Sequence, residues 1–310
     1  MVTFCFNLLK AARPRQWIKN FALLAGLLFS GGFSSLESIT SALYAFLIFC
    51  AASSATYLLN DIFDVDRDRL HPFKQKRPIA SGAISIPTAT IIALAIIVLI
   101  LPFAYQLSPA FFLAVLLYLI LQLLYSSYLK AIILLDVMTI AAGFVLRVYA
   151  GIWAIDAHLN VWFLLTVISF SLFLAIGKRR SELTILQAQA SKHRETLLHY
   201  PENFLDILTA MFANSTWLAY AFFTFLQPPI YARPRLIGIF AELNLPFTQA
   251  KYLMATIPVV IYAVMRYLYI IYEKKEGESP ERVILTDKPL LLSVILYGIM
   301  AIGIIYFLGS

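Results

Sequence analysis

Charged residues are scarce in this chain of 310 residues. Asp, Glu, Lys and Arg make up 13% of it, whereas a soluble domain carries roughly 25%. Hydrophobic residues make up 61%, and the mean hydropathy is +0.82. Because so few charges could not cover so much apolar area in water, a water-soluble globular enzyme is excluded. The surplus apolar surface must face lipid, so the sequence predicts an integral membrane protein.

Cysteine and histidine are also sparse. Cys5 and Cys50 form neither a disulfide framework nor a CxxC motif, and the four histidines are scattered without metal-ligand spacing. The formal net charge is +7, but no soluble domain presents a basic stripe, so nucleic acid is not expected as a partner. Short repeats, low-complexity tracts and flexible linkers are missing too, which predicts one transmembrane domain over residues 1–310.

Nine stretches are long and apolar enough for a membrane helix, which needs about 20 such residues. They are predicted at 18–35, 39–59, 86–106, 109–125, 131–155, 160–178, 205–227, 251–271 and 289–308. Three longer polar segments, 60–85, 179–204 and 272–288, separate some of these spans. The chemistry of the protein is expected in these three segments.

Lysine and arginine gather on one side of this arrangement. Most of the 24 bases precede the first span or fall in or next to the three polar segments. Because cytoplasmic connections are the ones rich in Lys and Arg, we expect a multi-pass protein of the plasma membrane with a cytoplasmic N-terminus. This rule alone accounts for the basic excess, and an added role in phosphate binding is compatible with it.

An acidic cluster follows the second predicted span, in the sequence NDIFDVDRD of residues 60–68. If the helix continues, its turn of about 100° per residue places Asp61, Asp64 and Asp68 on one face, with Asp66 pointing away. Three like charges beside a bilayer need a compensating cation. Hard oxygen ligands at this spacing suit Mg²⁺, which is usually shared with the phosphates of a substrate. The cluster therefore predicts a magnesium site.

Basic residues follow the acids within a dozen positions: Arg69, Lys74, Lys76 and Arg77. Arginine grips phosphate oxygens bidentately and lysine acts as a point charge. In an alternative interpretation, the acids are solvated at a helix end or pair with Arg67, Arg69 and Lys74. Acids for a metal beside bases for phosphate favour a metal-diphosphate site, in which the three aspartates of one face are the metal ligands and the catalytic residues.

The NDxxDxxxD pattern of residues 60–68 resembles the signature of the UbiA superfamily of intramembrane prenyltransferases. The longer string NDIFDVDRDRLHPFKQKRPIASG is similar to one branch of it, the decaprenyl-phosphate phosphoribosyltransferases. Further similarity lies in RPRQWIKN at 13–20, YSSYLK at 125–130, DVMTIAAGFVLRVYAG at 136–151, GKRRSEL at 177–183 and SPERVILTDKPL at 279–290. The resemblance covers essentially the whole chain. It implies an all-α protein with nine transmembrane helices around a central cavity that opens to the cytoplasm.

The branch resemblance also implies an activity. In it, phosphoribosyl pyrophosphate donates 5-phosphoribose to a polyprenyl phosphate in a reaction that uses Mg²⁺ and releases pyrophosphate, which supplies phosphoribose for envelope arabinose. Ordinary UbiA enzymes instead move a prenyl group to an aromatic acceptor and carry a second, DxxxD motif after helix six. Residues 179–204 lack that motif. Lys178 and Arg179 with Glu182 stand at this place, and such a basic run suits a more highly phosphorylated ligand.

Two other functions stay open at this point: prenyl transfer to an aromatic acceptor, and transport that uses intramembrane charge. A transporter predicts inverted repeats with polar residues at the bilayer midplane, whereas these acids cluster on one face. The sequence also leaves open whether the chain forms a homo-oligomer.

Several further residues are candidate substrate ligands. A charge inside an apolar span is costly, so Arg147 is expected either to face the cavity, as Asp136 on the same helix face does, or to pair with a carboxylate elsewhere. Lys130 is expected at the cytoplasmic mouth of this helix. Bases before the first span are either membrane anchors or, at Arg15 or Lys19, ligands of the lipid phosphate. The remaining candidates are Asn60, Tyr125 and the pair Asp287-Lys288, where Asp287 is at least as well explained as a helix N-cap.

Overall fold

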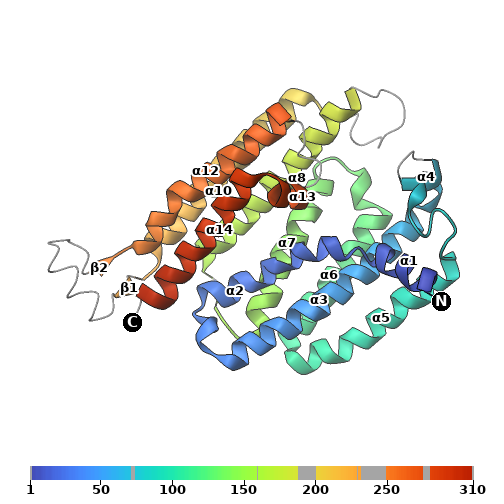
Figure 1. The fold of residues 1–310 in the computed structure, drawn as a ribbon, viewed down its shortest axis with the longest axis horizontal. Coiled ribbons are helices and arrows are strands. Elements are labelled where there is room, and N and C mark those ends of the chain that lie inside the picture. The colour runs from blue at the N-terminus through green and yellow to red at the C-terminus, as the bar shows by residue number, and fades with distance from the viewer. Residues whose placement is uncertain are drawn as a thin grey trace. The chain divides into compact units, whose positions relative to one another are not determined.

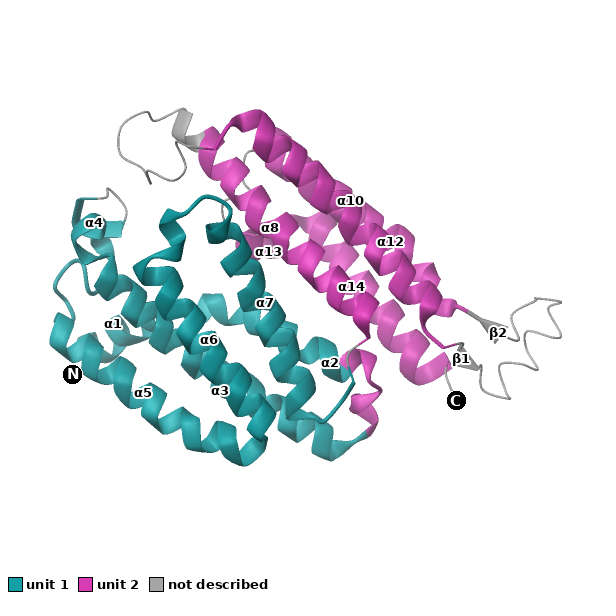
Figure 2. Cartoon of the chain, turned by 180° about the vertical axis from the view of Figure 1, so that it is seen from behind, with its two compact units in different colours: residues 1–27, 35–158, 191–199 teal, residues 28–34, 159–190, 200–310 magenta. Residues whose placement is uncertain are grey.

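The computed structural model describes residues 2–70, 74–158, 160–187, 200–228, 230–231, 249–274 and 280–308. These residues are almost entirely helical, as predicted. The strands among them are two residues long each: β1 (Ile230–Tyr231) pairs with β2 (Gln249–Ala250) in antiparallel register. The chain forms two compact units, which are described one at a time (Figure 2). The single transferase domain over 1–310 stays a prediction.

Unit 1 comprises residues 1–27, 35–158 and 191–199, and the last of these ranges lies outside the described residues. Its helices in chain order (Figure 1) are α1 (Val2–Ala12), the 3₁₀ segment η1 (Pro14–Leu23), most of α2 (Leu24–Phe29), α3 (Leu36–Phe63), α4 (Val65–Leu70), η3 (Lys74–Lys76), α5 (Ile86–Leu107), α6 (Pro109–Ser127), η4 (Leu129–Ala131) and α7 (Leu135–Ala154). Three of the long helices begin where the sequence supplies a cap. Ser35, Ser85 and Ser108 each accept a hydrogen bond from the amide three residues later, which satisfies a donor that the helix itself leaves free.

Helix α3 is the central element of unit 1. It packs against α5, α6, α7 and η1, and its buried side includes a run of small residues from Ala52 to Ala55. Small residues let neighbouring helices approach closely in a membrane, where packing rather than water drives association. Larger side chains fill the core beside them, with Phe49 against the rings of Phe111 and Tyr118. This packing fixes the end of α3, where the acidic cluster lies.

Gly151 in α7 allows the closest approach in unit 1. A Cβ atom at this position would lie 1.9 Å from the carbonyl oxygen of Leu23 in η1, a separation that backbone atoms cannot tolerate. We therefore expect Gly151→Ala to lower the free energy of unfolding by about 3 kcal/mol, at the upper end for overpacking. The measurement is the thermal unfolding of the purified protein in detergent.

Gly298→Ala in α14 (Lys288–Ile302) is the matched control, because nothing lies within 4 Å of its added Cβ. Alanine favours a helix by up to about 1 kcal/mol over glycine, so this variant is expected to be at least as stable as the parent. Equal destabilisation of both variants would contradict the close approach of η1 to α7.

Unit 2 contains the remaining elements, several of which run side by side in Figure 2: η2 (Gly32–Ser34), α8 (Val161–Gln187), α10 (Glu202–Leu226), β1, β2, η5 (Tyr252–Thr256), α12 (Ile257–Tyr269), the π segment η6 (Ile270–Lys274), α13 (Pro280–Thr286), α14 and η7 (Gly303–Leu308). Helix α8 packs along α10, and α12 packs along α14. Their core includes Phe173, Tyr267, Ile271 and Leu290. Gly177 of α8 gives room to Ile271, whose Cδ1 would lie 2.6 Å from a Cβ there.

Seven helical segments of the described chain are long and apolar enough to cross a membrane. They are Leu36–Phe63, Ile86–Leu107, Pro109–Ser127, Leu135–Ala154, Val161–Thr184, Tyr252–Lys274 and Lys288–Leu308. Each of the seven overlaps a predicted span over most of its length. The span predicted at 205–227 is a helix of 25 residues, α10, but its composition does not place it among the seven.

The prediction of a single membrane helix at 18–35 is wrong. This stretch is divided between η1, α2 and η2, and Gly31 between the last two has a φ of 78°. Glycine adopts such a left-handed conformation readily, so the Gly31-Gly32 pair ends the helix. The chain is therefore a helical protein with seven candidate spans, and the total of nine stays a prediction.

Candidate functional site

The acidic cluster sits where α3 gives way to α4. Helix α3 ends at Phe63, and Asp64 forms its C-cap. The amide of Asp64 still donates to Asn60 and that of Asp68 to Asp64, at 3.0 and 2.8 Å. Because these bonds keep the helical spacing across the junction, Asp61 and Asp68 are both buried, at 2% and 3% exposure. The side chain of Asp66 is 91% exposed and points away, as the spacing predicts.

Each of the three aspartates of this face is paired with a base. Arg77 Nη1 lies 3.1 Å from Asp61 Oδ1 and 2.5 Å from Asp68 Oδ2, so one guanidinium bridges two of the acids. Arg13 donates to the same Oδ1 of Asp61. Lys130 Nζ lies 2.6 Å from Asp64 Oδ1. Three acids thus contact three bases. The cluster as a whole carries no net charge.

One buried oxygen atom of the cluster has no hydrogen-bond partner in the described part of the chain. It is Oδ2 of Asp61, which is buried. Leaving a buried carboxylate oxygen without a donor is costly. A hard oxygen of this kind is the ligand that Mg²⁺ prefers, so the donor set fits a divalent cation. Among the described residues, no group of three or more acidic, His or Cys side chains is close enough by itself to hold a metal, because bases stand between the acids.

Arg13 is the site residue that the sequence did not single out. Among the bases before the first predicted span, the sequence favours Arg15 or Lys19 as a ligand of the lipid phosphate. In the structure it is Arg13 that contacts the acidic cluster, at Asp61. Its backbone is left-handed, with φ 52° and ψ 61°, a conformation that costs a residue other than glycine of order 1 kcal/mol. The guanidinium also stacks over the ring of Tyr57 at 5.1 Å. Pro14 is a sequence signal for this break in the helix at Arg13, because the residue before a proline is disfavoured from the helical conformation.

The other predicted ligands of unit 1 lie around the cluster or face solvent. Asn60 accepts a hydrogen bond from Ser126 at 3.1 Å, next to the half-buried Tyr125. Arg69 is 52% exposed and lies 3.6 Å from Asp66. Lys74 and Lys76, in η3, are exposed, whereas Lys19 is half-buried.

Arg147 lies inside α7 in a cage of neutral acceptors. Its guanidinium donates to Asn20 Oδ1 at 2.8 Å, to the Gly143 carbonyl at 2.8 Å and to Tyr118 Oη at 2.9 Å. It is 5% exposed, and no described carboxylate lies within ion-pair distance of it. The pairing of Arg147 with a carboxylate elsewhere is therefore not seen. Asp136 instead accepts a hydrogen bond from the amide of Val137 in its own helix at 2.8 Å.

The basic run near the end of α8 belongs to unit 2. Arg179 Nη1 lies 2.5 Å from Glu182 Oε2, and Lys178 Nζ lies 3.7 Å from Glu182 Oε1. Arg179 is 1% exposed, which makes it a fixed, buried base, whereas Lys178 is half-buried. The rest of the loop at 179–204 lies partly outside the described residues.

Comparison with known proteins identifies this arrangement. Residues 20–286, which include the whole acidic cluster, match the model of the UbiA prenyltransferase family. The chain belongs to this family. The matched region includes helices α3 and α4, which carry the NDxxDxxxD pattern of residues 60–68.

Two relatives are similar over nearly their whole length. The decaprenyl-phosphate phosphoribosyltransferase of Mycolicibacterium smegmatis is 33% identical over 288 residues, which are 92% of this chain and 87% of the relative. The protein of that name from Mycobacterium tuberculosis is 32% identical over 290 residues, 92% of this chain and 90% of the relative. A UbiA homologue of Archaeoglobus fulgidus, solved with GPP and Mg²⁺, shares the fold with a TM-score of 0.68 at 22% identity, over 96% of this chain and 99% of that one.

Proposed function

We propose that this UbiA protein transfers 5-phosphoribose from phosphoribosyl pyrophosphate to a polyprenyl phosphate and releases pyrophosphate. The observation that carries the proposal is similarity to decaprenyl-phosphate phosphoribosyltransferases over 92% of the chain. The site supports it independently, because buried acids and bases lie together at the end of a candidate membrane span. A phosphorylated donor and a phosphorylated lipid both suit such a site.

The charge balance of the cluster explains how it would select its donor. Three acids and three bases leave the cluster neutral by itself. With Mg²⁺ held by Asp61, Asp64 and Asp68, the cluster would gain two positive charges and would attract the diphosphate of the donor. The bound ion would stabilise negative charge on the departing pyrophosphate. The bases would then be free to exchange their partners, because the acids that they contact would serve as metal ligands.

The bases of the cluster would bind and orient the donor. Arg77, Arg13 and Lys130 would turn from the carboxylates to phosphate oxygens, where charge-assisted hydrogen bonds are strongest. The exposed bases Arg69, Lys74 and Lys76 would draw the donor toward the site. In the transfer, an oxygen of the lipid phosphate forms a bond to the anomeric carbon while the bond from that carbon to pyrophosphate breaks. No general base is needed, since a phosphate monoester with a second pKa near 6 is already ionised at neutral pH.

The setting of the reaction is part of the proposal. The apolar helices support a multi-pass membrane protein, and the distribution of Lys and Arg supports a plasma-membrane orientation with the acidic cluster and the N-terminus in the cytoplasm. A water-soluble donor would then reach the cluster from the cytoplasm and a polyprenyl phosphate from the bilayer. Envelope arabinose is the expected destination of the phosphoribose, and assembly into a homo-oligomer stays open.

A transfer assay with two labels tests the activity. Purified protein is incubated with decaprenyl phosphate and with phosphoribosyl pyrophosphate that carries ¹⁴C in its ribose and, separately, ³²P in its β-phosphate. We expect ¹⁴C in the lipid fraction and ³²P in free pyrophosphate. EDTA should reduce both to background because the acids then lack their cation, and added Mg²⁺ should restore both. A lipid fraction without ¹⁴C, together with prenyl transfer to an aromatic acceptor, would replace this proposal by the alternative UbiA activity.

A further inference from the structure

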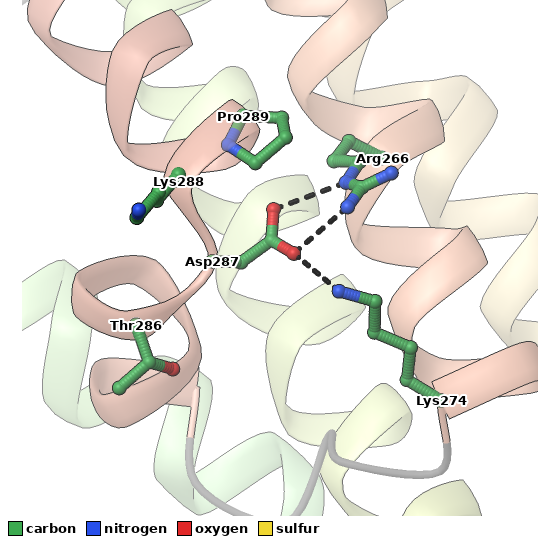
Figure 3. A pocket seen from close by; sticks show the side chains of 6 residues that line it. All are labelled: Arg266, Lys274, Thr286, Asp287, Lys288 and Pro289. Atoms are coloured by element: carbon green, nitrogen blue, oxygen red, sulfur yellow. Dashed lines mark hydrogen bonds and ion pairs between the residues drawn. The ribbon is translucent and has the colours of Figure 1, made fainter.

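A charged pocket lies in unit 2, where the end of α12 and η6 meets the start of α14 (Figure 3). Its volume is about 350 Å³, and it is lined by Arg266, Lys274, Thr286, Asp287, Lys288 and Pro289. A volume of this size is in the range of small-ligand sites. The lining includes three bases and one acid, so the pocket has an excess of two positive charges.

Asp287 holds two of the three bases in place. Its Oδ1 accepts hydrogen bonds from Arg266 Nε at 3.0 Å and from the Leu290 amide at 3.1 Å, and its Oδ2 accepts from Arg266 Nη2 at 2.9 Å and from Lys274 Nζ at 2.7 Å. The N-cap predicted for Asp287 is thus confirmed. The hydrogen bonds from Arg266 hold the pKa of Asp287 well below its usual range. A permanently ionised acid therefore fixes Arg266 and Lys274 in one geometry.

Lys288 is the base that Asp287 does not neutralise. It is exposed, it makes no ion pair or hydrogen bond with any described residue, and its ammonium group points away from the carboxylate of Asp287 (Figure 3). The carboxylate has no free acceptor position for it, because each oxygen already accepts two hydrogen bonds. The positive charge that remains can therefore attract an anion from outside the chain.

The position of the pocket along the chain indicates what this anion is. Lys274 is the last residue of the candidate span Tyr252–Lys274, and Lys288 is the first of the span Lys288–Leu308. Since α12 packs along α14, the pocket lies at the ends of two adjacent spans, at the level where a bilayer carries its phosphates. Bases at this level attract anionic headgroups by about 1 kcal/mol each.

We propose that the pocket formed by Arg266, Lys274 and Lys288 is a binding site for a phosphate group. Arg266 and Lys274, fixed by Asp287, would each turn a remaining N–H donor toward it, and Lys288 would close the site from the other side. The phosphate belongs either to an anionic lipid or to a free phosphate compound. This site uses none of the residues of the acidic cluster, so the inference does not depend on the proposed function.

Lys288→Gln tests the site, with Arg282→Gln as the matched control. Arg282 is exposed on the neighbouring helix α13 but does not line the pocket. The full-length protein is titrated in neutral detergent and EDTA, in one arm with a short-chain phosphatidylglycerol and in the other with inorganic phosphate at constant ionic strength. The rise of the thermal unfolding midpoint gives each affinity. Removing one base should weaken binding about fivefold in Lys288→Gln, while Arg282→Gln stays within about twofold of the parent.

The two arms separate the sources of the phosphate. Saturable binding of the lipid alone identifies a headgroup site, and binding of inorganic phosphate in the second arm identifies a site for free phosphate compounds. In either case the proposal stands only if Lys288→Gln weakens the binding. It is overturned if neither ligand binds saturably, or if Arg282→Gln loses as much affinity as Lys288→Gln, since the bases would then act only through the general attraction of a basic membrane face.

Discussion

Asp61→Asn is expected to lower the rate of phosphoribosyl transfer about a thousandfold, the loss typical of removing a central electrostatic contact in an active site. The substitution preserves the shape of the side chain but removes its charge. It also replaces one of the two carboxylate oxygens by an NH₂ group, which cannot bind a cation. Oδ2 of Asp61 is the buried oxygen without a hydrogen-bond donor, and it is therefore the atom best suited to hold Mg²⁺. The substitution removes the negative charge that this atom shares.

Asp66→Asn is the control for this variant. It removes a carboxylate from the same segment, but the side chain of Asp66 is 91% exposed and lies on the opposite side. The ¹⁴C transfer assay is run on both proteins at saturating Mg²⁺, and thermal unfolding checks that both are folded. Asp66→Asn should retain activity within about threefold of the parent, as expected for a surface substitution. Comparable losses in both variants would contradict the assignment of Asp61 as a metal ligand.

The sequence predicts that the three acids share one face but not which bases they contact, for a physical reason. Helical periodicity is local, so the spacing of Asp61, Asp64 and Asp68 places them on one face before any packing is known. Arg77 follows Asp68 by nine residues, but the other two partners come from distant parts of the chain. Arg13 is 48 residues from Asp61, and Lys130 is 66 residues from Asp64. Such contacts depend on how α3 packs against η1 and α6, which the local pattern does not contain.

The same distinction holds for the fold. Long apolar runs such as 86–106 predict helices directly, because hydropathy depends only on composition. The run at 18–35 is less apolar, since it includes Lys19 and Asn20, and its backbone enters through a 3₁₀ segment that begins at Pro14 and turns at Gly31. Arg147 also escapes prediction, since its cage is assembled from Asn20 and Tyr118 on two other elements. Hydropathy indicates that a buried charge must be satisfied, but tertiary packing decides by which groups.

Arg77→Gln is expected to have opposite effects on the two ligands of the acidic cluster. Without a diphosphate, Arg77 competes with a metal ion, because it contacts both Asp61 and Asp68. Its removal leaves the cluster with one negative charge in excess, so Mn²⁺, used in place of Mg²⁺, should bind several-fold more tightly. The affinity of the metal-loaded protein for pyrophosphate should fall at least tenfold, since a charge-assisted hydrogen bond contributes about 1.5–3 kcal/mol. Transfer should fall about a hundredfold.

Titration of Mn²⁺ by electron paramagnetic resonance, with and without pyrophosphate, measures both affinities in the same preparation. Arg67→Gln is the control, because Arg67 is exposed on α4 and forms no ion pair with a described residue. It should change neither affinity by more than about twofold. If Arg77→Gln weakened Mn²⁺ and pyrophosphate alike, Arg77 would act by holding the acids in position. Opposite changes require that the same guanidinium serves the carboxylates before the donor arrives and the phosphates afterwards. In that case metal and donor each promote the binding of the other, and the neutral cluster admits neither one strongly alone.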